Sequence, residues 1–184
     1  MFPLEKIEQA AERIGGVVTK TPFAFAPYLS ETSGVRVFLK KENLQVTGAF
    51  KIRGAFNKIA SLDAEECARG VVAASAGNHA QGVAYSAAHF GIRAVIVMPE
   101  STPLTKVDGV RHYGAEVILA GTNYDEAYAH AVEYGKQNNL VFVHPFEDDE
   151  VIAGQGTIGL EILEQTETLD AVLVPVGGGG LICG

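Results

Sequence analysis

The stretch "GVVAASAGNHAQGVAYSAAHFGIRAVIVMP", Gly70–Pro99, decides the fold class. It opens with a short apolar run over 70–75, continues with a helical pattern over 78–91 and closes with a second apolar run over 93–99. Short apolar runs bounded by glycine or proline are typical of buried strands. Two strands joined by a helix of this length lie parallel, because the crossover returns the chain to the same edge of the sheet. The stretch therefore predicts a parallel sheet.

The same alternation continues on both sides of this unit. We expect helices over 4–14, 51–62, 103–114, 124–139 and 150–165, and further strands over 35–40, 115–121, 140–145 and 170–176. The predicted fold class is α/β, with open parallel sheets and helices on both faces.

Composition limits the possible partners. The chain has 184 residues, of which 47% are hydrophobic, and a formal net charge of −8 with no basic run, which argues against nucleic acid and anionic membrane surfaces. Its first residues lack a signal-peptide pattern and no apolar stretch is long enough to cross a bilayer, so we expect a cytoplasmic protein. Cys67 and Cys183 lie far apart without metal-ligand spacing, so we expect reduced thiols and no metal site.

A single lysine stands where the helix of "TGAFKIRGAF", Thr47–Phe56, begins. The helix dipole disfavours a cation at this end by about 0.3 to 1 kcal/mol, which is too little to make Lys51 neutral without desolvation. Lys51 is therefore either a reactive amine or an ordinary solvated surface lysine, and taken alone it favours the second interpretation.

The junction "SAGNHAQG" after the strand at 70–75 is a candidate carboxylate site. Ser75 offers a hydroxyl, Gly77 permits close approach of the backbone, and Asn78 and His79 open a helix whose first N–H groups are free. A plain turn in which Ser75 or Asn78 is the N-cap is the simpler alternative.

Four consecutive glycines follow the predicted strand at 170–176. Gly177, Gly178, Gly179 and Gly180 let backbone donors surround an anion such as a phosphate. A flexible linker is the alternative, although linkers rarely follow a buried strand directly. A nucleotide P-loop is excluded because no Gly-Lys-Ser/Thr ending is present.

"GQGTIG", Gly154–Gly159, matches the dinucleotide-binding fingerprint by letter. That fingerprint has meaning only directly after a strand, and here the preceding strand is expected to end near Pro145. We therefore expect a closely packed helix, or a pocket-lining loop with Gln155 and Thr157, and keep a NAD-binding domain as an alternative.

Taken together, a lysine amine, a carboxylate-sized site and a phosphate-sized site describe a pocket for pyridoxal 5'-phosphate and an amino acid substrate. The lysine would carry the cofactor aldehyde as a Schiff base, the glycines would hold its phosphate and the Ser75–His79 turn would orient the substrate carboxylate.

Four stretches also resemble the threonine dehydratases of the fold-type II pyridoxal phosphate family, which share the tryptophan synthase β-like fold. They are "KENLQVTGAFKIRGAFNKI", "SAGNHAQGVA", "VIAGQGTIGLEI" and "VPVGGGGLI". The resemblance implies that Lys51 binds the cofactor with Phe50 beside its ring, that Asn78 contacts the pyridine 3-hydroxyl, and that Gly177–Gly180 hold the phosphate. The implied substrate-binding turn comprises Ser75, Ala76, Gly77, Asn78 and His79.

Ala76 is the informative departure from related enzymes. Serine racemases resemble this chain but carry a serine at this position that exchanges a proton on the face opposite the lysine. Alanine has no exchangeable proton, so the resemblance implies elimination rather than racemisation.

The implied activity is the deamination of L-threonine to 2-oxobutanoate and ammonia, with L-serine as second substrate and isoleucine biosynthesis as one setting. A serine racemase or another fold-type II enzyme, a NAD-binding domain and an inactive fragment remain alternatives. The family organisation places 1–69 and 148–184 in an incomplete large domain and 70–147 in a small mobile domain. We expect a homodimer or homotetramer at full length, and an inactive chain when residues 1–184 stand alone.

Overall fold

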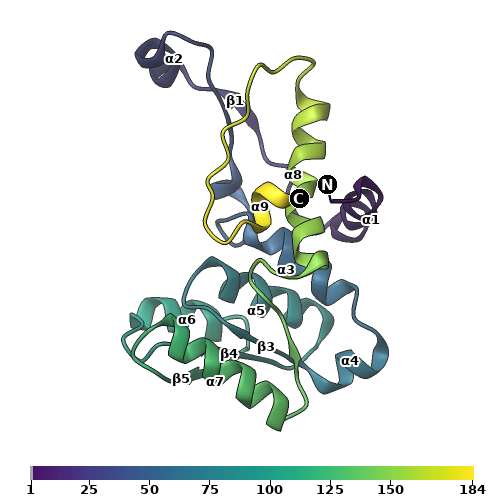
Figure 1. Ribbon diagram of the computed structural model, residues 1–184, viewed down its shortest axis with the longest axis vertical. Helices are drawn as coiled ribbons and strands as arrows, with labels where there is room; N and C mark the ends of the chain where they lie inside the picture. The colour runs from purple at the N-terminus through teal and green to yellow at the C-terminus, as the bar shows by residue number, and fades with distance from the viewer. Residues whose placement is uncertain (1) are drawn as a thin grey trace.

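The computed structural model describes residues 2–184 and contains a four-stranded parallel sheet in the order β5-β4-β3-β6 (Figure 1). The strands are β3 Val71–Ala74, β4 Ala94–Met98, β5 Glu116–Leu119 and β6 Val141–Phe142. All neighbouring pairs run parallel, with Val72 opposite both Val95 and Phe142. The parallel sheet predicted from the sequence is confirmed, with each strand shorter than its apolar run.

Helices cover both faces of this sheet, as predicted. The crossovers are α5 Asn78–Phe90, α6 Leu104–Arg111 and α7 Tyr124–Gln137. Val71 and Ala73 point to the face that packs on α5 and α6, whereas Val72 and Ala74 point to the face that packs on α7. This alternation follows from the two-residue period of a strand, and burial on both faces explains why the strands are apolar throughout.

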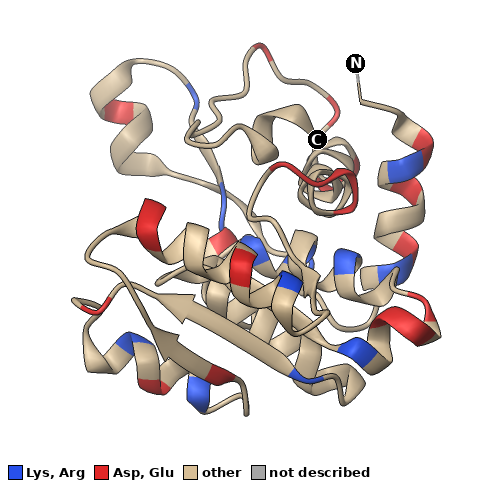
Figure 2. Ribbon diagram, turned by 60° about the horizontal axis from the view of Figure 1, so that its bottom comes forward, with Lys and Arg blue, Asp and Glu red and all other residues tan. Residues whose placement is uncertain are grey.

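Charged residues lie mainly on helices and at strand ends (Figure 2). β3 and β4 contain none, and every residue of both strands is buried.

Three helices outside the sheet form the second packing unit. α3 Lys51–Ala60 lies between α5 on one side and α8 Asp149–Gln165 on the other, and α1 Leu4–Ile14 packs on α8 (Figure 1). Gly82 of α5 approaches α3 so closely that a Cβ there would lie 3.2 Å from the Lys51 carbonyl oxygen. α3 therefore joins the sheet to the rest of the chain.

Several short elements were not predicted. They are β1 Phe23–Phe25, which pairs antiparallel with β2 Phe38–Lys40, together with α2 Pro27–Ser33, the 3₁₀ helix η1 Glu42–Leu44 and α4 Ala64–Arg69. α9 Gly180–Cys183 begins at the end of the glycine run, where a helix start is expected. The strand expected over 35–40 is therefore present only as β2, in an antiparallel pair. α4 carried a readable signal, since Asp63 and Glu66 form a capping box at its start.

The strand predicted over 170–176 is wrong. This segment has no assigned strand, and Leu173 is 93% exposed. A strand exists through hydrogen bonds to a neighbour, and no segment within residues 2–184 pairs with this one. The apolar character of this segment alone was therefore insufficient to predict a strand.

The NAD-binding interpretation of "GQGTIG" is also wrong. Gly154–Gly159 lie inside α8, away from any strand end. A Cβ on Gly154 would lie 2.5 Å from the Arg53 carbonyl oxygen and 2.6 Å from the Gly54 Cα, so this glycine allows α8 and α3 to touch. The expected closely packed helix is confirmed.

The sheet elements span 71–142, within the range 70–147 expected for a small domain; the mobility of that domain stays a prediction. None of the helices in residues 2–184 combines the length and apolar character that a membrane crossing requires.

Candidate active site

Lys51 is the first residue of α3, and its amine faces the segment that follows β6. Nζ donates a hydrogen bond to the Pro145 carbonyl oxygen at 2.7 Å and lies 5.5 Å from the centre of the Phe50 ring. Phe50 is the N-cap residue of α3 and makes no side-chain capping bond.

Burial lowers the pKa of Lys51 below its ordinary value of 10.5. Desolvation disfavours the ammonium form, and the positive end of the α3 dipole acts in the same direction. The fully solvated surface lysine considered from the sequence is therefore excluded. The position favours a fraction of neutral, nucleophilic amine.

The turn opposite Lys51 is shaped by His144. Its Nδ1 accepts hydrogen bonds from the backbone N–H of Phe146 at 3.2 Å and of Glu147 at 2.7 Å. Burial lowers the pKa of His144, which keeps a lone pair available for these two bonds. The turn holds the Pro145 carbonyl against the Lys51 amine. Sequence reasoning missed these residues, although "HPF" directly after a strand end marked the place.

A cavity of about 320 Å³ lies between Lys51 and the glycine run. It is lined by Phe50, Lys51, Phe146, Pro175, Val176, Gly177, Gly178, Gly179, Gly180 and Leu181. The structure thus brings together Lys51, Phe50 and the four glycines, which the sequence had singled out separately. Their roles towards a cofactor stay predictions.

The cavity wall fits a phosphorylated aromatic aldehyde. A Cβ on Gly178 would enter the Phe146 ring, and Gly179 has φ +87, so this part of the wall is backbone rather than side chains. An amine of lowered pKa suits the aldehyde, aromatic side chains suit the pyridine ring and exposed peptide groups suit the phosphate, so the lining fits pyridoxal phosphate.

The β3–α5 junction differs in detail from the plain turn considered above. Gly77 is the N-cap of α5 and Asn78 is its first residue, with no side-chain capping bond. Ser75 Oγ instead accepts a hydrogen bond from the Gly77 N–H at 3.2 Å. The alternative prediction that Ser75 or Asn78 is the N-cap is therefore wrong. The first N–H groups of α5 have no side-chain cap, so they are free to bind an anion.

His79 connects the β3–α5 junction to the chain just after β6, which leads into the turn opposite Lys51. It is buried, and its Nε2 lies 3.0 Å from the Val143 carbonyl oxygen. Because a carbonyl only accepts, Nε2 carries the proton, and Nδ1 has no partner within residues 2–184. Burial lowers the pKa of His79 to about 4, so the ring is neutral at pH 7. Its side chain is thus a link between α5 and the β6 end.

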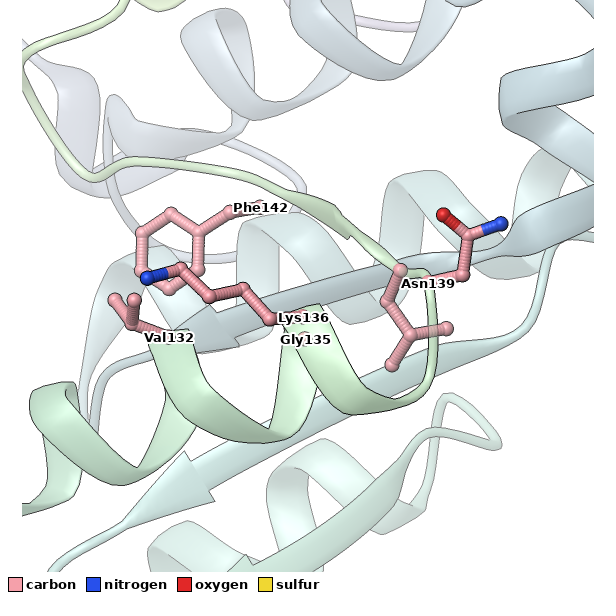
Figure 3. Close-up of a pocket in the computed structure, with 6 residues that line it drawn as sticks. Val132, Gly135, Lys136, Asn139 and Phe142 are labelled. Carbon is pink, nitrogen blue, oxygen red and sulfur yellow. The ribbon is translucent and has the colours of Figure 1, made fainter.

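The residues of this junction, 75–79, do not line the cavity at Lys51. Their predicted contact with a substrate carboxylate and with the cofactor 3-hydroxyl stays a prediction. A second, smaller cavity of about 190 Å³ lies between α7 and β6, where the Lys136 side chain extends towards Phe142 (Figure 3). None of the predicted site residues lines it.

Comparison with known proteins identifies the fold family. The family model described as pyridoxal-phosphate dependent enzyme matches residues 14–184. The chain belongs to this family. Its cofactor is therefore pyridoxal phosphate, and Lys51 is the lysine that faces the glycine-lined cavity.

The relatives include ammonia-lyases and racemases. The chain is 57% identical to the L-threonine ammonia-lyase of Thermotoga maritima over 184 residues, which is 100% of this chain and 46% of that protein. Threonine deaminase isoform 2 from Solanum lycopersicum superposes with a TM-score of 0.90 at 43% identity, over 98% of this chain and 51% of that chain. Serine racemase from Dictyostelium discoideum superposes with a TM-score of 0.90 at 41% identity, over 97% of this chain and 58% of that chain. The chain spans about half the length of these relatives.

Within residues 2–184 no group of three His, Cys, Asp or Glu side chains is arranged to hold a metal ion.

Proposed function

We propose that the protein containing this chain is a pyridoxal phosphate-dependent ammonia-lyase that converts L-threonine to 2-oxobutanoate and ammonia, with L-serine as a second substrate. The observation that carries this proposal is the position of Lys51, whose half-buried amine faces the cavity lined by Gly177–Gly180. The names of the relatives at 52–57% identity, L-threonine ammonia-lyases of two bacteria, support the substrate.

The residues that would hold the cofactor come from two parts of the chain. Lys51 would bind the aldehyde, the peptide groups of Gly177–Gly180 would bind the phosphate, and Phe50 and Phe146 would flank the ring. When bound, pyridoxal phosphate supplies an electron sink for charge that develops at the substrate α-carbon.

Lys51 is the base that removes the α-proton in this proposal. With the cofactor held in this cavity, the Lys51 amine would lie beside the substrate α-carbon and would be the group that accepts its proton. Burial lowers the pKa of Lys51, which increases the fraction of free amine that can accept the proton. Loss of the β-hydroxyl as water, followed by hydrolysis of the C–N bond, gives 2-oxobutanoate and ammonia.

The α5 N-terminus is the proposed site for the substrate carboxylate. Its first N–H groups lack a side-chain cap, and Gly77 leaves open space beside them, since a Cβ there would meet no atom within 4 Å. The free N–H groups and the positive end of the α5 dipole both favour a carboxylate at this place.

Racemisation is the second candidate, because serine racemases are among the structural neighbours. Ala76 argues against it. Inversion requires a proton donor on the face opposite Lys51, and the methyl group of Ala76 cannot provide one.

We further propose that the protein is a cytoplasmic homo-oligomer, a homodimer or homotetramer, in which 70–147 move as a small domain. Light scattering of the protein expressed from its complete gene would test the assembly. A monomer would refute it.

The activity test uses the protein expressed from its complete gene, incubated with pyridoxal phosphate and L-threonine. We expect 2-oxobutanoate from the wild type and from Lys58→Ala, which changes another lysine of α3, and a loss of at least about a thousandfold in Lys51→Ala. With L-serine we expect pyruvate and little D-serine. Activity of Lys51→Ala near that of the wild type would refute the proposed role of Lys51, and D-serine as the main product would favour the racemase.

A further inference from the structure

Arg53 is the largest fully buried side chain of this structure, and the proposed chemistry does not use it. Its Nε and Nη2 donate to the two carboxylate oxygens of Glu42, both at 2.8 Å. Its Nη1 and Nη2 donate to the two carboxylate oxygens of Glu161 at 2.6 and 3.0 Å. Lys40 completes the group through an ion pair with Glu161. We call these four residues the Arg53 cluster.

The Arg53 cluster is balanced in charge and well satisfied. Its two cations face two carboxylates, and Arg53 also donates to Thr157 Oγ1 at 3.1 Å and to the Thr19 carbonyl oxygen at 3.3 Å. Burial alone would lower the pKa of Arg53, but the bonds to Glu42 and Glu161 outweigh it and raise the pKa. Two bidentate carboxylates on one buried guanidinium fix its position and direction.

This cluster holds the turn of α3 that begins with Lys51. Side chains two residues apart on a helix point about 200° apart, so Arg53 anchors the side of the turn opposite Lys51. The first turn has no side-chain cap at Phe50 and no acidic residue. Besides its packing between α5 and α8, its side-chain anchors are the bond from the Gly54 N–H to Gln155 Oε1 at 3.2 Å and the Arg53 cluster. Helix ends without caps fray.

We propose that Arg53 is a positioning residue for Lys51. By fastening the first turn of α3 to η1 and α8, the Arg53 cluster keeps the Lys51 amine against the Pro145 carbonyl and shielded from bulk water. The inference rests on the proposed role of Lys51 as the cofactor-binding amine. Burial, rather than a neighbouring cation, is what lowers the pKa of Lys51, so Arg53 acts through position and not through its charge.

Two variants test the proposal on the protein expressed from its complete gene. Arg53→Lys keeps the positive charge but loses the planar guanidinium that binds two carboxylates bidentately. Glu161→Gln removes one of the two carboxylates. The matched control is Arg13→Lys, because Arg13 also joins α3 to α8, through Asn57 at 3.2 Å and Glu150 at 2.7 Å, but further along α3 than Lys51. Each protein, stripped of cofactor, is mixed with pyridoxal phosphate over about pH 6 to 9. Borohydride then fixes the link, and mass spectrometry quantifies the Lys51 peptide.

Misplacement of a reacting group by about 1 Å can cost roughly a hundredfold, so we expect both cluster variants to form the Lys51 link at least about tenfold more slowly. Their rate profiles should also move to higher pH, because water that reaches Lys51 raises its pKa. Arg13→Lys should match the wild type in rate and profile.

Denaturant unfolding of the same proteins separates positioning from stability. Cluster variants that unfold more easily but link the cofactor with the wild-type rate and pH profile would overturn the proposal, since the cluster would then be structural only. If Arg53→Lys does not fold, Glu161→Gln decides by the same criterion. Absence of a Lys51 link in the wild type would refute the proposed role of Lys51, and this inference with it.

Discussion

The α3–α8 helix pair and the segment 166–179 contribute opposite kinds of structure to one site. In the helix pair, glycines allow backbone contact, and the Arg53 guanidinium is fully paired with carboxylates. Segment 166–179 has neither helix nor strand, and Leu173 is 93% exposed. Yet Lys51 comes from the first region and the glycine run starts in the second. A reactive side chain can thus come from a closely packed helix pair while the backbone opposite it comes from an exposed segment without regular structure.

The largest expected effect comes from a substitution that forces α3 and α8 apart. Gly154→Ala would place a Cβ 2.5 Å from the Arg53 carbonyl oxygen and 2.6 Å from the Gly54 Cα, both backbone atoms that cannot turn aside. We expect a loss of about 3 kcal/mol or more in the free energy of unfolding, measured by denaturant titration.

Gly159→Ala is the control on the same helix. A Cβ at Gly159 meets no atom within 4 Å, so alanine should stabilise α8 by about 0.5 to 1 kcal/mol. Equal effects of the two substitutions would show that α3 and α8 do not touch at Gly154.

His79 gives the next largest effect, and it depends on pH. Its pKa is about 4 when folded, against an ordinary value of 6.5, so as the pH falls the unfolded chain takes up this proton first. The stability that neutral His79 contributes is therefore complete above about pH 6.5 and lost towards pH 4, by up to about 3 kcal/mol.

His79→Gln should remove most of this slope, because glutamine can donate to the Val143 carbonyl without titrating. Unfolding free energies at several pH values between 4 and 7 would measure it. An unchanged slope would mean that His79 is not buried in its neutral form.

The sequence predicted the sheet region because its signals are local. Val71–Ala74 and Ala94–Met98 are apolar throughout, and the helix between them has a clear period, so the parallel pair followed. β1 and its antiparallel pairing with β2 were missed because a three-residue strand carries almost no period. The strand at 170–176 was wrong because pairing depends on a partner that no local pattern reveals.

The candidate site was likewise only partly predictable. Lys51 and Gly177–Gly180 were identifiable from residue type and position at element ends. Phe146 and the Pro145 carbonyl were not, because "HPF" after a strand end marks a turn but no local pattern shows that this turn faces Lys51. Arg53 also carried no sequence signal of burial. Charged side chains are rarely buried unless they are paired, and the sequence does not show that Arg53 pairs with Glu42 and Glu161.

A substitution at Gly178 tests whether the glycine segment forms the cofactor-binding wall of the cavity. Gly178→Ala would push a methyl group into the Phe146 ring, which lines the cavity and must move. We expect the dissociation constant for pyridoxal phosphate to rise about tenfold, or about 1.4 kcal/mol, in a titration followed by absorbance. Gly159→Ala is the control, because Gly159 lies outside the cavity lining and its Cβ meets no atom within 4 Å. Equal affinities of the two variants would place the cofactor away from Phe146.

The smallest effect is expected in the exposed segment. In the chain of residues 1–184, Leu173→Ser should change the free energy of unfolding by less than about 0.5 kcal/mol. Leu140→Ser, at a leucine that is only 8% exposed, should cost about 2 to 5 kcal/mol. Similar losses at both positions would show that segment 166–179 is packed in solution, and the contrast between the two regions would not hold.

Mapping the cofactor link tests the central claim, that Lys51 is the amine of this site, most directly. The protein expressed from its complete gene is incubated with pyridoxal phosphate, reduced with borohydride and digested, and the modified peptide is sequenced by mass spectrometry. We predict one modified lysine, Lys51, and no modification in Lys51→Ala. A stable adduct on another lysine, with Lys51 unmodified, would contradict the account.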